Sequence, residues 1–176
     1  MAFKRAIIGE GHVLYRRGFF LLAALLCGST FADAQGVLTE HSVSLQLARV
    51  IGDAAIAECK KDGFDVSAVV VDRAGLMKIL LRSDAASPHN ADLARRKAYT
   101  ARTFKISSMD FEKRTEPGMP LAGQRLLAEV IPLGGGVPIN AGTETIGGVG
   151  VSGSPSQEED EKCAKAGVSA AANILK

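Results

Sequence analysis

Two pairs of β-rich segments, each joined by a short turn, constrain the fold of this chain more than any other feature. The first pair covers Val66–Val71 and Leu76–Arg82, and the residues between them, 72–75, run Asp-Arg-Ala-Gly. This turn is typical of a hairpin, because Asp supplies a side-chain acceptor and Gly a permissive backbone. The second pair turns at Ala141-Gly142 and continues as an apolar strand from Thr145 to Val151. Two β-hairpins are therefore expected.

Helical patterns separate the hairpins. A first helix is predicted from about Ser44 to Asp62, where apolar residues share one helical face and Gly63 follows as a C-terminal cap. Ser87 and Pro88 predict the start of a second helix, because Ser caps free backbone N–H groups and Pro suits the first helical position. His89 then falls in the first turn. One face of this helix is nearly all alanine, namely Ala91, Ala94, Ala98 and Ala101.

A shorter helix is predicted around Asp110–Thr115, and Leu126–Val130 is left unassigned. Ser154 as a cap, Pro155 in the first position and the acidic residues that follow predict a last helix reaching about Leu175, since carboxylates favour the positive end of a helix dipole. The order helix, hairpin, helix, hairpin, helix predicts an antiparallel sheet covered by helices. The fold class is thus α+β, in a single domain.

The first 34 residues have the pattern of a secretory signal peptide. Four basic residues precede an uncharged apolar run of about 14 residues, Gly18–Phe31, which is short of the roughly 20 that a membrane-spanning helix needs. Small residues at Ala32 and Ala34 suit cleavage before Gln35. The pair Arg16-Arg17 also fits a twin-arginine signal, so both export routes stay open. We expect a periplasmic or secreted domain of residues 35–176, with no stable membrane insertion after cleavage.

The positive net charge belongs to this leader. Four of the 21 basic and two of the 19 acidic residues lie in it, so residues 35–176 carry 17 of each. This balance, with an ordinary 23% of charged residues, gives no reason to expect a nucleic-acid partner. Basic residues gather within 95–114 and acidic ones at 158–161. Both are typical of solvated helix faces, although Arg and Lys near a cleft also anchor carboxylates.

Several enzyme motifs can be tested. Gly148–Gly153 matches G-x-G-x-x-G, but its glycines lie largely inside the predicted strand and too little chain follows for the remaining units of a dinucleotide-binding fold. The simpler interpretation is that the glycines permit close approach of a neighbouring backbone or a ligand. The sequence contains no G-x-S-x-G and no C-x-x-C, which weakens hydrolase, zinc-ribbon and c-type cytochrome hypotheses.

Only His41 and His89 remain after removal of the leader, which excludes a three-histidine metal cage within one chain. His89 lies near a predicted helix N-terminus, where the dipole disfavours imidazolium and keeps the ring in the neutral form that ligates iron. A surface histidine without a ligand is the alternative, and the local residues alone favour it. His41 has weaker local support.

Cys59 and Cys163 are the only cysteines after residue 34. Export permits a disulfide between them, and such a bond would close a loop of about 100 residues. Two buried reduced thiols are the alternative, and we slightly favour them, because sequence alone cannot place the two Cα atoms within reach.

Several blocks of sequence, in a fixed order, are together far more specific than any one of them. They are Val69–Gly75, Pro88–Asn90, Ala94–Ala101, Gly134–Ile139, Gly147–Gly153 and Asp160–Ala164. Over nearly all of residues 35–176 the chain thereby resembles the GlcG/HbpS-like heme-binding family. The resemblance implies a profilin-like antiparallel sheet with flanking helices and assembly into homo-oligomers, octamers among them. Some members bind heme or take part in its degradation, and others accompany glycolate oxidation or occur beside cobalamin enzymes.

The resemblance also implies site residues. His89 is the first candidate for a heme-iron ligand or pocket residue, and His41 precedes the first helix, where some relatives place a heme-contacting histidine. Arg96 and Lys97 are candidates to pair with heme propionates or a small carboxylate, and Tyr99 to stack or hydrogen-bond. The alternative for residues 97–101 is simply a helix packed on the sheet.

The resulting hypothesis is an exported, oligomeric protein that binds heme non-covalently and stores, delivers or helps to degrade it. One rival is an enzyme or auxiliary protein that acts on a small organic acid through Arg96, Lys97 and His89. The other is a scaffold whose function is its assembly surface. Whether the chain is an enzyme is left open.

Overall fold

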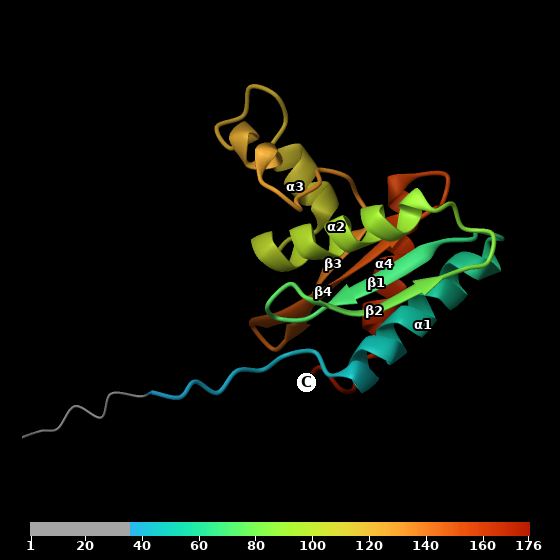
Figure 1. Ribbon diagram of the computed structural model, residues 1–176, viewed down its shortest axis with the longest axis horizontal. Helices are drawn as coiled ribbons and strands as arrows, with labels where there is room; N and C mark the ends of the chain where they lie inside the picture. Colours follow the sequence, from blue (N-terminus) through green and yellow to red (C-terminus); the bar gives the residue numbers. More distant parts are fainter. Residues whose placement is uncertain (1–35) are drawn as a thin grey trace, which may run out of the picture. The chain divides into compact units, whose positions relative to one another are not determined.

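Both predicted hairpins form, and they join into one antiparallel sheet of four strands in the order β2-β1-β4-β3 (Figure 1). The computed structural model describes residues 36–176, of which 40–176 form a unit of their own. The predicted signal peptide lies outside the described residues. The strands are β1 (Ser67–Val71), β2 (Met77–Arg82), β3 (Gly136–Ala141) and β4 (Glu144–Ser152). The first turn forms as predicted, because the carboxylate of Asp72 accepts hydrogen bonds from the backbone N–H groups of Ala74 and Leu76.

Four α-helices and one 3₁₀-helix complete the described fold, and they are α1 (Leu45–Lys61), α2 (His89–Phe104), α3 (Ser108–Arg114), η1 (Ala122–Leu126) and α4 (Gln157–Ala170). Two predicted caps are wrong. Ser87 does not cap α2, whose N-cap is Pro88 and has no side-chain cap hydrogen bond. Ser156, not Ser154, caps α4, because the side chain of Ser154 bonds to Asp160 instead. The last helix is also shorter than predicted at both ends.

The two faces of the sheet carry different helices. Side chains of β1 alternate between a larger core cluster shared with α1 and α4 and a smaller one shared with α2. In Figure 1, α2 lies on one side of the sheet and α1 and α4 on the other. On the α2 side, a Cβ atom at Gly150 would lie 2.1 Å from the backbone oxygen of Ala94, and one at Gly148 would lie 2.4 Å from that of Ala98. Two of the three glycines of the G-x-G-x-x-G match, Gly148 and Gly150, therefore serve close packing of α2 on β4.

A disulfide joins Cys59 at the end of α1 to Cys163 in α4, with the Cα atoms 5.5 Å apart. The expectation of two reduced thiols is therefore wrong. Both residues are fully buried within the larger core cluster. Because α1 and α4 pack against each other on one face of the sheet, positions 104 residues apart in sequence come within bonding reach. The bond ties the first helix to the last.

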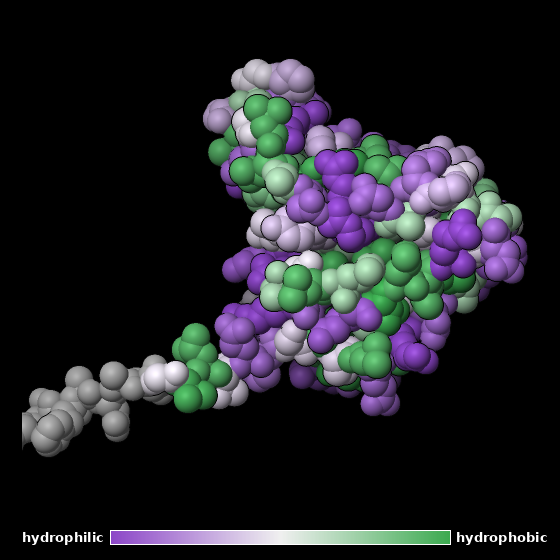
Figure 2. Space-filling view, in the orientation of Figure 1, coloured by the Kyte–Doolittle hydropathy of each residue, from purple (hydrophilic) through white to green (hydrophobic). Residues whose placement is uncertain are grey.

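Strand β2 is one edge of the sheet and is largely exposed. Figure 2 shows an apolar band over the position that β2 occupies in Figure 1. The large apolar side chains exposed there are Leu76, Met77 and Leu80. Within residues 36–176, no helix is both long and apolar enough to cross a bilayer.

Candidate functional site

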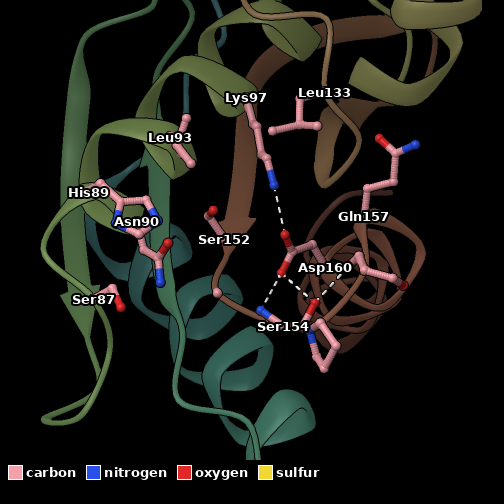
Figure 3. A pocket seen from close by; sticks show the side chains of 13 residues that line it. Ser87, His89, Asn90, Leu93, Lys97, Leu133, Ser152, Ser154, Gln157 and Asp160 are labelled. Carbon is pink, nitrogen blue, oxygen red and sulfur yellow. Dashed lines mark hydrogen bonds and ion pairs between the residues drawn. The ribbon is translucent and has the colours of Figure 1, made fainter.

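A polar cavity opens between the first residues of α2 and those of α4 (Figure 3). Its volume is about 330 Å³. We call it the α2–α4 cavity, and its lining residues are Ser87, His89, Asn90, Leu93, Lys97, Leu133, Ser152, Gly153, Ser154, Pro155, Ser156, Gln157 and Asp160. Small-ligand sites have volumes of roughly 300 to 1,000 Å³, so this cavity has room for a small molecule. Two of the predicted site residues, His89 and Lys97, meet here.

A buried ion pair forms one wall of the cavity. Lys97 is 1% exposed, and its Nζ donates to Asp160 Oδ2 at 2.7 Å and to the backbone oxygen of Val151 at 3.1 Å. Burial lowers the pKa of Lys97 below its ordinary value, and the neighbouring Asp160 carboxylate partly opposes this effect. The other oxygen of Asp160 accepts from both the backbone N–H and the hydroxyl of Ser154. The pair is therefore internally satisfied.

Three consecutive glycines, Gly134–Gly136, allow the backbone to lie close to this ion pair. Gly135 has φ +115°, a region that favours glycine, and a Cβ atom there would lie 2.8 Å from the Cβ of Asp160 and 3.0 Å from the Nζ of Lys97. A Cβ at Gly136 would lie 2.2 Å from the backbone oxygen of Lys97. These glycines therefore allow the segment to pack closely against Lys97.

The polar residues Asn90 and Ser152 also line the cavity. Asn90 is 6% exposed and Ser152 3% exposed. They lie close together in space because α2 packs on β4, with Ala94 over Gly150. In Figure 3 the hydroxyl of Ser152 points into the space between α2 and α4, with Asn90 beside it. Sequence reasoning missed both residues, since neither carries a local signal.

His89 lies at the rim of the cavity and is exposed. Its imidazole has no hydrogen-bond or ion-pair partner in the described part of the chain. Its place in the first turn of α2 is as predicted. The ring therefore has both nitrogens available to a ligand or to water.

His41 is far from this cavity. Its Nδ1 lies 2.8 Å from Glu144 Oε2, and its side chain is 78% exposed. Glu144 begins β4 and Ser152 ends it, so the two histidines lie near opposite ends of a strand that spans about 26 Å at about 3.3 Å per residue. The structure therefore does not bring His41 and His89 together in one site.

A short polar network holds His41. Arg73 in the β1–β2 turn pairs with Glu144 and, at 3.5 Å, with Glu40. The hydrogen bonds from His41 and Arg73 lower the pKa of Glu144 below its ordinary value. The backbone N–H of Arg73 also donates to the hydroxyl of Ser42 at 3.2 Å. The segment around residue 41 is thereby joined to both hairpin turns.

The remaining predicted residues serve the packing of α2. The guanidinium of Arg96 donates to the backbone oxygen of Val130 at 2.7 Å. The ring of Tyr99 lies against Gly75, where a Cβ atom would be 2.9 Å from the ring. Neither residue lines the α2–α4 cavity. Among residues 36–176, no group of three or more His, Cys, Asp or Glu side chains is placed to hold a metal ion.

Comparison with known proteins identifies the family. A family model described as haem-degrading protein HbpS-like matches residues 43–169. This chain belongs to the HbpS-like family. It is 32% identical to Protein GlcG of Escherichia coli strain K12 over 114 residues, which are 65% of this chain and 84% of GlcG. The predicted family and the α+β fold are thus confirmed.

Solved structures that are similar to this chain agree with its fold. A double mutant of HbpS from Streptomyces reticuli is 34% identical, and the alignment covers 76% of this chain and 88% of HbpS with a TM-score of 0.70. A complex of PduOC with heme is 27% identical, and the alignment covers 73% of this chain and 94% of PduOC with a TM-score of 0.67. A heme-related function is therefore supported for this chain.

Proposed function

We propose that this protein binds heme non-covalently and that His41 ligates the iron. The observation that carries the assignment is the hydrogen bond between His41 Nδ1 and Glu144 Oε2 at 2.8 Å. A histidine that ligates a metal through one ring nitrogen usually donates the N–H of the other to a carboxylate or carbonyl, which fixes the tautomer and the ring orientation. With Nδ1 held in this way, Nε2 is the nitrogen left for iron.

The surroundings of His41 fit a porphyrin better than those of His89. The turn that follows β1 contacts Glu40 and Ser42, on either side of His41, and it leads into the exposed apolar side chains of Leu76 and Met77 at the start of β2. A porphyrin is a large apolar ring with two carboxylates, so it requires apolar contact. The α2–α4 cavity instead has an ion pair and several hydroxyls in its walls. His89 is therefore the second candidate for the iron ligand.

Each residue of the network has a separate role in this proposal. Glu144 keeps the proton on Nδ1 of His41, and Arg73 holds the Glu144 carboxylate in place. The lowered pKa of Glu144 keeps it ionised as the pH falls below the ordinary range of a carboxyl group. When bound, heme supplies a redox-active iron and a Soret absorption band.

The openness of the His41 region favours reversible holding and delivery of heme over its burial as a permanent group. The His41 side chain is 78% exposed, and Glu144 is 39% exposed. Bound heme at this position is accessible to a partner that takes it up. The periplasmic or secreted location and the homo-oligomeric state complete the proposal as expectations from the sequence.

A heme titration tests the assignment. Heme is added to the purified protein, to His41→Ala and to His89→Ala, and binding is followed by the Soret band. We expect saturable binding by wild type and by His89→Ala, and affinity at least about tenfold weaker for His41→Ala, since a lost metal ligand costs more than a lost neighbour. Retained affinity in His41→Ala with loss in His89→Ala would move the ligand to the cavity. No saturable binding by wild type would overturn the proposed function.

A further inference from the structure

Lys97 is a buried amine that heme binding at His41 does not use. Its side chain is 1% exposed, yet it lines the α2–α4 cavity, so a small molecule in the cavity would lie against it. In Figure 3 the amine points into the space between Leu133, Ser152 and Asp160. Lysine is a nucleophile only when its amine is neutral, and buried lysines with a lowered pKa are the ones with which enzymes form imines.

The surroundings of the Lys97 amine favour its neutral form. Burial lowers the pKa of Lys97 below its ordinary value. At about pH 7 an ordinary lysine has less than about 0.1% of its amine in the neutral form, and each unit by which the pKa falls raises that fraction about tenfold. The Nζ atom donates to Asp160 at 2.7 Å and to the backbone oxygen of Val151 at 3.1 Å. A neutral amine keeps both hydrogen bonds, and its lone pair is left for a ligand.

Asp160 is placed to move the protons of such a reaction. Its Oδ2 atom lies 2.7 Å from the Nζ of Lys97, which is within the reach that a general base requires. Its Oδ1 atom accepts from the backbone N–H of Ser154 at 3.0 Å and from the hydroxyl of the same residue at 2.7 Å. Ser154 therefore holds the carboxylate in position while Asp160 takes up and returns a proton.

The rest of the cavity fits a short, uncharged molecule. Its volume is about 330 Å³, and Leu93 and Leu133 provide apolar contact for a few carbon atoms. Since Lys97 and Asp160 already balance each other's charge, the pair does not attract an ion. We propose that Lys97 forms a reversible imine with a small aldehyde or ketone that binds in the α2–α4 cavity.

The reaction needs no other reagent. Asp160 takes one proton from the Lys97 ammonium, the freed lone pair forms a bond to the carbonyl carbon, and the carbonyl oxygen receives that proton. A second proton passes from the nitrogen to the hydroxyl by the same route, the C–O bond breaks, and water leaves as the C=N bond forms. The iminium carries the single positive charge that the ammonium carried. Asp160 thus remains paired, which avoids a buried uncompensated charge.

Trapping with acetone and cyanoborohydride tests the proposal. Cyanoborohydride delivers hydride to an iminium and fixes the acetone carbons on the lysine, and peptide mass spectrometry then identifies the position. Lys165, which is 62% exposed and paired with Glu161, is the internal reference. At about pH 7 and without heme, we expect Lys97 to be modified at least about tenfold faster than Lys165, with a rate that saturates as acetone is raised. An inert buried ion pair predicts the opposite order, because Lys97 is the less accessible of the two.

Two variants provide the second arm. Lys97→Arg keeps the positive charge beside Asp160 but forms no imine, so the main adduct should disappear. Lys165→Arg is the matched control and should keep the adduct at Lys97. In urea, where the cavity is lost, the preference for Lys97 over Lys165 should vanish.

The proposal is overturned if Lys97 is modified no faster than Lys165, if its rate never saturates with acetone, or if its preference survives in urea. If Lys97→Arg does not fold, the peptide map of wild type decides the question. The outcome is independent of heme binding at His41, because the two sites lie near opposite ends of β4 and the trapping contains no heme.

Discussion

Removing the Cys59–Cys163 disulfide should cost this domain a large share of its stability. In the chain-entropy model a cross-link that closes a loop of 104 residues stabilises the fold by about 4.7 kcal/mol at 25 °C. Both cysteines are fully buried, so replacing them by alanine adds a further loss of packing. Domains have total stabilities of roughly 5 to 15 kcal/mol. The double variant Cys59→Ala/Cys163→Ala is therefore expected to be marginally folded.

Urea unfolding measures this effect. The oxidised protein, its reduced form and the double variant are compared, each as residues 35–176, which lack the third cysteine, Cys27. The unfolding free energy should fall by about 4 to 5 kcal/mol on reduction, which moves the midpoint by about 2 M for a slope near 2 kcal/mol per M. A decrease of less than about 1 kcal/mol would refute the reasoning. Alkylation of the unfolded, unreduced protein should find neither cysteine free.

Three further predictions concern the cavity and the His41 network. Lys97→Met should destabilise the fold by about 3 to 5 kcal/mol in urea unfolding, because it leaves Asp160 buried and unpaired, and Lys97→Met/Asp160→Leu should recover most of the loss. The pKa of the Lys97 amine should lie below 10.5 when it is measured by NMR. Because the unfolded chain then binds this proton more tightly than the folded chain does, the free energy of unfolding should rise with pH between the lowered pKa and 10.5. A pKa of Lys97 at its ordinary value would contradict the burial argument. Glu144→Gln should weaken heme binding by about tenfold through the tautomer of His41, and unchanged affinity would exclude this positioning role.

The elements of this fold were predictable because their signals are local. The Asp72 turn, the alanine face of α2 and the acidic start of α4 each depend on residues within one or two turns of the chain. The misplaced caps show the limit of this approach. Two serines near the start of α4, Ser154 and Ser156, can each act as its N-cap. Ser156 caps the helix because the side chain of Ser154 is hydrogen-bonded to Asp160.

The candidate site was only partly predictable, because it depends on contacts between distant segments. His89 and Lys97 stand out in the sequence, but Asp160 lies 63 positions after Lys97, and nothing local indicates that they pair. Asn90 and Ser152 meet only because glycines allow α2 to pack closely on β4. The disulfide likewise depends on the packing of α1 on α4. Glu144, the partner of His41, lies 103 positions after it, which sequence spacing does not reveal.

Chemical rescue tests the role of His41 most directly. Heme is bound to the purified His41→Ala variant, and imidazole is then added while the Soret band and the heme affinity are recorded beside His89→Ala. If His41 ligates the iron, free imidazole should restore the wild-type spectrum in His41→Ala and leave that of His89→Ala unchanged. A His41→Ala protein that already has the wild-type spectrum and affinity without imidazole would contradict the account.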